Sequence, residues 1–260
     1  MDSEFAAARR RRMSPTKSGP GIVATTFVVL ICVGILCGLG YWQLQRKVWK
    51  ENLIAAMTER LNQTPQPLPP PSEWGNLSQD KDEFRRVRFS AEFLPGQEAL
   101  VYTAGSALRT DIQGPGYFIF APARLPGGEV VVVDRGFVPL DRKQVATRGS
   151  GAPEGTLDIV GVLRWPETRG MFTPAADTKN NVWFLRDAPA MSANGQWGSK
   201  APFYIDQESP VPPGGWPKPG RLEVHLPDNH LQYAITWFGL AAALLGVYGW
   251  WLAGRVRTQA

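Results

Sequence analysis

Two long apolar runs without a charged side chain constrain this chain more than any other feature. The first extends from Ser18 to Gln45, and its core, Gly21 to Gly40, is about as long as a helix that crosses the hydrocarbon layer. The second covers Leu231 to Gly254 and is followed at once by Arg255 and Arg257. The sequence therefore predicts two transmembrane helices, at residues 21–42 and 230–253.

Basic residues flank both runs on the side of the chain ends. Arg9 to Arg12 and Lys17 lie in a tail at residues 1–20, and a short basic tail follows at 254–260. Because cytoplasmic segments carry the positive charge, both termini are expected in the cytoplasm and the central domain in the periplasm of a bacterial-type inner membrane. The net charge of +5 is thus explained by membrane topology, and we expect contact with lipid but no nucleic-acid partner.

A cleaved signal peptide is the alternative interpretation of the first run. The run lacks a clean small-x-small cleavage site and continues directly into helical sequence. Large apolar residues recur at helical spacing past the membrane, which predicts an amphipathic stalk helix over 43–63. The helix is expected to end before Thr64, because the proline-rich stretch from Pro65 to Pro71 cannot continue it.

From Phe84 onward the apolar period changes from helical to two. Val87, Phe89, Ala91 and Phe93 alternate with polar residues, as in a half-buried strand. Glycine, proline and asparagine clusters separate the further runs, which predicts an antiparallel barrel or sandwich over 64–229. The fold class is therefore a membrane-anchored, mainly β (α+β) protein. The further strands are predicted at Glu98–Ala104, Tyr117–Pro122, Glu129–Val138, Thr156–Arg164, Val182–Arg186, Phe203–Asp206 and Arg221–Leu226.

Motifs for catalysis are missing from the sequence. There is no phosphate-binding glycine loop, no GxSxG, HExxH or CxxC, and the two cysteines, Cys32 and Cys37, both lie in the first apolar run. Four carboxylates beside strands or turns are candidates for pairing in space, but solvating a strand end is the commoner role of such residues. We therefore expect no enzymatic activity. The four are Asp134, Asp141, Asp158 and Asp206.

His230 is the one residue whose position favours a cofactor. It begins the second apolar run, with Tyr233 and Trp237 on the same helical face. A helix N-terminus disfavours imidazolium, so a neutral, metal-binding imidazole is stable there. Two interpretations follow: His230 is an axial ligand of a haem iron, or it caps the helix at the interface.

Four stretches, in this order, carry a resemblance to a known family: LGYWQLQRKVWKENLI after the first run, GPGYFIFAP with VVVDRGFVP, NVWFLRD with PFYID, and NHLQYAITWFGLA at the second run. From about Gly38 to Leu252 the chain resembles the surfeit locus protein 1 family of cytochrome c oxidase assembly factors. The family pattern before the histidine is Asn-Asn-His-Leu, and this chain has Asp228 in place of the first Asn; an aspartate caps a helix equally well.

The resemblance implies a non-catalytic factor that assists haem A insertion and maturation of subunit I of a haem-copper cytochrome c oxidase. It implies subunit I, and possible exchange with haem A synthase, as partners, and haem A as a transient cofactor. His230 would ligate the iron, Trp42, Tyr233 and Trp237 would line the porphyrin, and Gln43 and Arg46 would meet its polar groups.

Two other functions remain open from sequence. The first is a cofactor-free scaffold that stabilises an assembly intermediate of subunit I through the helices and the β domain. The second is an envelope enzyme that uses the carboxylates, for which no set of acid, base and nucleophile is found.

Overall fold

The computed structural model describes residues 21–149, 155–224 and 228–259, which form two compact units. The anchor unit consists of Met1–Lys50 and Asp228–Ala260, and the β domain is Glu51–Pro227. The predicted basic tail at 1–20 lies outside the described residues.

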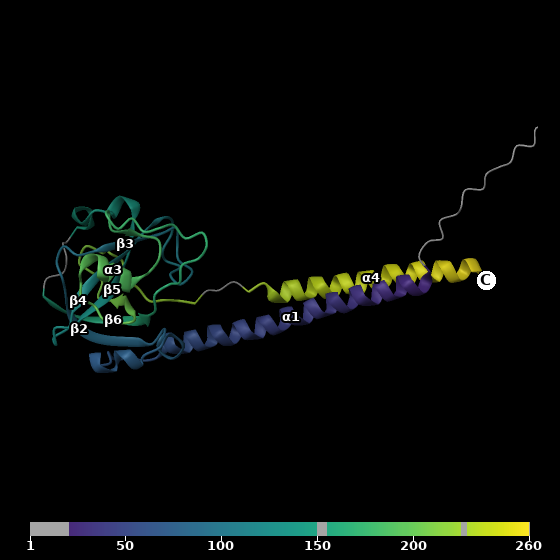
Figure 1. The fold of residues 1–260 in the computed structure, drawn as a ribbon, viewed down its shortest axis with the longest axis horizontal. Coiled ribbons are helices and arrows are strands. Elements are labelled where there is room, and N and C mark those ends of the chain that lie inside the picture. The colour runs from purple at the N-terminus through teal and green to yellow at the C-terminus, as the bar shows by residue number, and fades with distance from the viewer. Residues whose placement is uncertain (1–20, 150–154, 225–227, 260) are drawn as a thin grey trace, which may run out of the picture. The chain divides into compact units, whose positions relative to one another are not determined.

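Two long helices form the anchor unit: α1 (Ile22–Asn62), as far as Lys50, and α4 (His230–Gln259), which lies beside it (Figure 1). Both are long and apolar enough to cross a membrane, and only 6% of the residues in the most apolar window of each are buried. The core helix of a soluble protein would be mostly buried, so the exposed apolar surface is that of membrane helices. The expected pair of membrane helices flanking a β domain is confirmed, while the division of α1 into span and stalk stays a prediction.

Close packing joins the two helices at a glycine. A Cβ atom at Gly40 would lie 2.8 Å from the ring of Phe238, so only the absence of a side chain lets the ring sit there. Nearer the other end of the pair, the hydroxyls of Thr26 and Tyr248 share a hydrogen bond. The α1–α4 contact is thus fixed at two points along the helices.

Five strands of the β domain close into a small barrel. In the barrel β2 pairs with β6, β6 with β8, β8 with β5, β5 with β4, and β4 with β2 again, while β3 continues the sheet from β4. Two short strands, β1 and β7, extend the sheet beside β2 and β3. The strands are β1 (Gln66–Pro67), β2 (Arg86–Phe93), β3 (Ala99–Thr103), β4 (Gly116–Arg124), β5 (Val130–Pro139), β6 (Thr156–Arg164), β7 (Val182–Trp183) and β8 (Tyr204–Ser209).

Short helices fill the connections between the strands. Asp187 caps the longest of them, accepting a hydrogen bond from the backbone N–H of Ala190. The short helices are η1 (Pro71–Asn76), α2 (Gln79–Asp82), η2 (Leu140–Arg142), η3 (Val145–Arg148) and α3 (Ala188–Gly195).

Most neighbouring strands are antiparallel, as the sequence predicts, but three pairings are parallel: β1 with β2, β3 with β7, and β5 with β8. The connection from β5 to β8 passes through β6 and β7, which is long enough for a parallel crossover. Alternation along β5 puts Val131 and Val133 in the barrel core and Val132 in a second apolar cluster outside it.

The two mouths of the barrel differ. Strand directions bring the start of β8 and the end of β6 to one mouth, where the Trp74 ring packs edge-on against Phe203 at 5.6 Å. Trp74 also donates from Nε1 to the carbonyl of Pro69 at 2.8 Å. The proline-rich connector therefore closes this mouth as well as linking α1 to the barrel. The ends of β2, β5 and β8 lie at the opposite mouth.

Two strand predictions are wrong in extent. The run Val182–Arg186 forms a strand only at Val182–Trp183, because the chain then turns toward the capping residue of α3. The described part of Arg221–Leu226 is not a strand. The alternation of apolar and polar residues in this segment has another cause. Leu222 packs in an apolar cluster with Leu61 and Val162, while the backbone of residues 221–224 does not pair with a strand.

Candidate functional site

The predicted site begins where α4 begins. Asp228 accepts a hydrogen bond at Oδ1 from the backbone N–H of His230, 2.9 Å away. This carboxylate satisfies one of the free N–H groups at the helix start, as expected for a capping aspartate. His230 itself is half-buried, and the hydrogen bond that its ring makes is to Gln43 on α1.

The imidazole of His230 meets α1 through Gln43. Nδ1 of His230 lies 2.7 Å from Oε1 of Gln43, a residue 187 positions away in sequence. A carbonyl oxygen only accepts hydrogen bonds, so Nδ1 is the donor in this contact, and in the neutral ring the lone pair is then on Nε2. This is the tautomer in which a histidine binds a metal through Nε2, with a second residue holding the ring in place.

Helical spacing places Trp237 near His230 on α4. Trp237 is half-buried, two turns along the helix, whereas Tyr233 is 55% exposed at the edge of the same face. Ala234 and Ala241 are buried on this face and mark the side of α4 that packs on α1. The face toward α1 therefore contains His230 and Trp237, with Tyr233 beside them.

The remaining predicted residues lie elsewhere on α1. Trp42 is 53% exposed and stands about 200° around the helix from Gly40, away from the packed face. Arg46 is exposed, and its guanidinium stacks over the ring of Trp49 at 3.8 Å. The structure thus brings Gln43 to His230 and does not bring Trp42 or Arg46 into contact with it.

Two of the four predicted carboxylates form a pair inside the β domain. Asp134 on β5 and Asp206 on β8 are opposite each other in register, and they are 0% and 3% exposed. Burial raises the pKa of Asp134 to about 8 and raises the pKa of Asp206 as well, because the low dielectric disfavours two adjacent charges. Arg186 compensates, with Nε 3.9 Å from Oδ2 of Asp134.

This buried pair does not resemble a catalytic site. A catalytic carboxylate needs contact with substrate, and neither aspartate is accessible from solvent. Of the two roles that the sequence offered, pairing in space is thus the one found for Asp134 and Asp206, and solvation of a strand end is not. Solvation fits Asp158, which accepts from the Ser90 hydroxyl at 2.6 Å on the surface, and Asp141, which is exposed. The sequence pattern did not show that Asp134 and Asp206 are buried side by side on β5 and β8.

Metal ligation by a cluster of side chains is not supported in the described ranges. Groups of three or more histidine, cysteine or carboxylate side chains that could hold a metal are not found there. Cys32 and Cys37 are free thiols exposed on the apolar surface of α1. An isolated histidine such as His230 suits an iron already held by a macrocycle, which needs only an axial ligand.

Comparison with known proteins places the chain in a family. The sequence model of the SURF1 family matches residues 30–242, from the first membrane helix into the second. The chain belongs to the SURF1 family. It is 34% identical over 231 residues to surfeit locus protein 1 of Homo sapiens, covering 84% of this chain and 74% of the human protein.

Relatives from distant organisms give the same result. A SURF1-like protein of Monosiga brevicollis is 34% identical over 222 residues, which cover 81% of each chain. A SURF1-like protein of Drosophila melanogaster is 33% identical over 235 residues, covering 85% of this chain and 72% of its own length. None of these names describes an enzymatic activity. As a SURF1 family member with two helices able to span a membrane, the chain is a membrane protein.

Proposed function

We propose that this chain is an assembly factor for haem-copper cytochrome c oxidase, which assists haem A insertion into subunit I and holds the haem through His230. Family membership supports the general role. The observation that carries the haem-handling role is the 2.7 Å contact between Nδ1 of His230 and Oε1 of Gln43. This contact leaves Nε2 as the free ligand atom.

The residues around His230 suit an axial ligand. Gln43 fixes the ring orientation and raises the basicity of Nε2, while Trp237 and Tyr233 offer flat apolar surface beside it. Arg46 lies one helical turn beyond Gln43, where its guanidinium would pair with a propionate after leaving the Trp49 ring. Trp42 would contact the porphyrin edge or the partner protein from the outer side of α1. Bound haem A supplies the iron and the redox chemistry.

The orientation in the membrane is part of the proposal. The basic chain ends favour the cytoplasm, so the β domain lies in the periplasm of a bacterial-type inner membrane. His230 begins α4 and would then lie at the outer interface. From this position the protein would receive haem A, with haem A synthase as a possible donor, and pass it to subunit I.

A cofactor-free scaffold is the second candidate, and one observation favours it. Trp42 and Trp49 are exposed on α1, by 53% and 50%, on a side that α4 does not cover. Large aromatic side chains on a free helix face suit contact with another membrane protein. In this account the helices hold an intermediate of subunit I, and His230 contributes only to the packing of α1 and α4.

A visible absorption spectrum of the full-length, detergent-purified protein from cells that make haem A tests the proposal. The wild type is expected to show a haem band, and His230→Ala is expected to lose it. Gln43→Ala should lower haem retention about 10–100-fold, since the residues that orient a ligand have effects of this size. Gln45→Ala, an exposed amide on the same helix, is the matched control and should retain the band.

Co-purification of subunit I separates the two candidates. If neither the wild type nor His230→Ala carries haem, yet both retain subunit I, the scaffold is correct and the haem-handling role is rejected. If the band persists in His230→Ala, another residue is the ligand.

A further inference from the structure

The mouth of the barrel at the ends of β2, β5 and β8 carries surplus positive charge among the described residues. Arg135 on β5 and Arg148 on η3 are 6% and 3% exposed, and they share one carboxylate. Nη1 of each lies close to Glu98, at 3.1 Å for Arg135 and 2.6 Å for Arg148. Lys143 lines the same cavity, in which Glu98 is the only carboxylate among the described lining residues. Two buried guanidinium groups therefore share one carboxylate, and Lys143, whose ammonium lies over the Tyr117 ring at 5.2 Å, adds a third positive charge to the lining.

The two arginines are not equally satisfied. Arg148 also donates to the backbone carbonyls of Arg142 and Lys143, at 3.0 and 2.6 Å. Arg135, among the residues that the structure describes, donates only to Glu98, and its guanidinium stacks on the Phe93 ring at 4.7 Å. Burial lowers the pKa of Arg135, and the charge of Arg148 lowers it further, against the effect of Glu98. An anion at this guanidinium would complete its hydrogen bonding.

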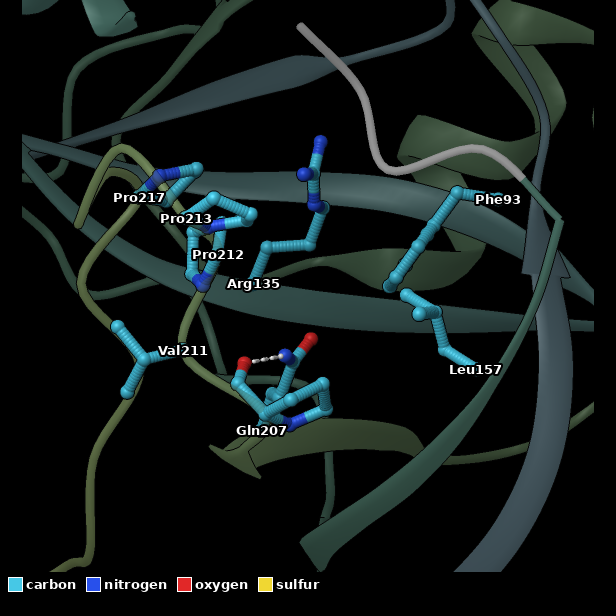
Figure 2. Close-up of a pocket in the computed structure, with 9 residues that line it drawn as sticks. Phe93, Arg135, Leu157, Gln207, Val211, Pro212, Pro213 and Pro217 are labelled. Carbon is cyan, nitrogen blue, oxygen red and sulfur yellow. Dashed lines mark hydrogen bonds between the residues drawn. The ribbon is translucent and has the colours of Figure 1, made fainter. Parts of the chain in front are cut away.

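Arg135 lies between two cavities of different character. One, of about 170 Å³, has an apolar lining that includes Phe93, Leu157 and Val211, with several prolines (Figure 2). The other, of about 240 Å³, contains the amides of Gln97, Asn180 and Asn181 beside the cationic groups. A ligand that fills both must therefore join an anionic group to a compact apolar one.

The proline-rich wall of the apolar cavity is held in place. Nε2 of Gln207 donates to the carbonyl of Pro210 at 2.8 Å, as Figure 2 shows. At the other end of this segment, Phe137 and Lys218 exchange backbone hydrogen bonds of 3.1 and 2.8 Å. Gly136 makes this approach possible, because a Cβ there would lie 2.2 Å from the Lys218 carbonyl. The cavity is thus largely preformed, which lowers the entropic cost of binding.

We propose that this mouth, the Arg135 pocket, binds the free carboxyl terminus of a polypeptide whose last side chain is apolar. The carboxylate would pair with Arg135 and Lys143, the last side chain would fill the apolar cavity, and the amides would meet the final peptide group. A cavity of about 150 Å³ holds a ligand the size of benzene, so the apolar side accepts one side chain and excludes a long acyl chain. The pocket lies wholly in the β domain and does not depend on the proposed haem-handling role.

Fluorescence anisotropy with the full-length protein in detergent tests this site. The probes are fluorescein-labelled hexapeptides that differ only in the last residue, Leu, Phe, Ala or Asp, each with a free or an amidated terminus. Leu and Phe peptides with a free carboxylate should bind at least tenfold more tightly than the Asp peptide and than their own amides. Equal binding of acid and amide, or no binding of any peptide, would overturn the proposal.

Variants locate the binding. Arg135→Gln is expected to weaken binding at least tenfold, whereas Arg124→Gln, an exposed arginine on β4, should change it less than twofold. Because Arg135 is buried and its loss can affect folding, Lys143→Gln and Val211→Glu provide surface changes at the rim, each expected to weaken binding severalfold. Unchanged affinity in all three pocket variants would place the peptide elsewhere. Displacement of the Leu peptide by an equal concentration of octanoate would reject a peptide ligand in favour of a fatty acid.

Discussion

Asp134 makes the folding stability of the β domain depend on pH. Its Oδ1 accepts from the backbone N–H of Gly136 at 3.0 Å, while Oδ2 has no hydrogen-bond donor among the described residues. With Asp206 beside it, the folded protein retains a proton on this pair that the unfolded chain releases above about pH 4. The folded state therefore binds more protons than the unfolded state between about pH 4 and the folded pKa of about 8.

Replacing Asp134 with asparagine should remove much of this pH dependence. The contribution of the pair to stability is fully present below the unfolded pKa and is lost as pH rises toward 8, so the wild type loses stability over this range. Asparagine imitates the protonated acid. The melting temperature of Asp134→Asn relative to wild type should therefore rise between pH 5 and 8, by about 2–5 °C per pH unit. Thermal unfolding of the purified protein measures this, with the surface variant Asp158→Asn as control. A parallel pH dependence in Asp134→Asn and wild type would contradict it.

At the scale of elements, the sequence predicts helices and strands better than it predicts which faces meet. Apolar length alone identified both membrane helices, because the bilayer sets that length. Of the three glycines Gly34, Gly38 and Gly40 on α1, only Gly40 is at a position where a Cβ would meet another side chain within 4 Å. A one-dimensional pattern cannot give the rotation of α4 about α1. For the same reason, the sequence could not show that Gln43 pairs with His230, or which two of the four candidate carboxylates would pair.

Gly40 therefore provides a test of the α1–α4 contact. In a variant with both native cysteines replaced by alanine, Thr26→Cys and Tyr248→Cys should be joined by a bis-maleimide cross-linker, because the native hydrogen bond brings the two side chains together across the length of a tyrosine ring, which is too far for a disulfide. Adding Gly40→Leu should reduce the cross-linked fraction at least twofold, since the new side chain displaces Phe238. Gly34→Leu, where a Cβ meets nothing within 4 Å, is the matched control and should leave cross-linking unchanged. An equal loss in both variants would mean that added bulk alone, and not the Gly40 contact, disturbs the pair.

At the scale of the whole molecule, function depends on the side of the membrane on which each part lies. Two spans put the segment between them on one face and both chain ends on the other. The β domain has no cysteine, and both thiols of the chain lie on α1, so single engineered cysteines report topology cleanly once these are replaced. The basic residues at both ends favour the cytoplasm for the termini.

Labelling with a membrane-impermeant maleimide tests this orientation. Met171→Cys, at a position 92% exposed in the β domain, should react fully in intact spheroplasts. Val256→Cys, 58% exposed near the end of α4, should react at least tenfold less until the membrane is permeabilised, because the bilayer would separate it from the reagent. The reverse pattern would place the β domain in the cytoplasm, and with it the start of α4 and His230. Haem transfer at the outer interface would then be untenable, even if His230 proved to be a haem ligand. Equal labelling of both positions without permeabilisation would contradict the second span. Position 256 is protected from the reagent only if α4 crosses the membrane and places it on the cytoplasmic side.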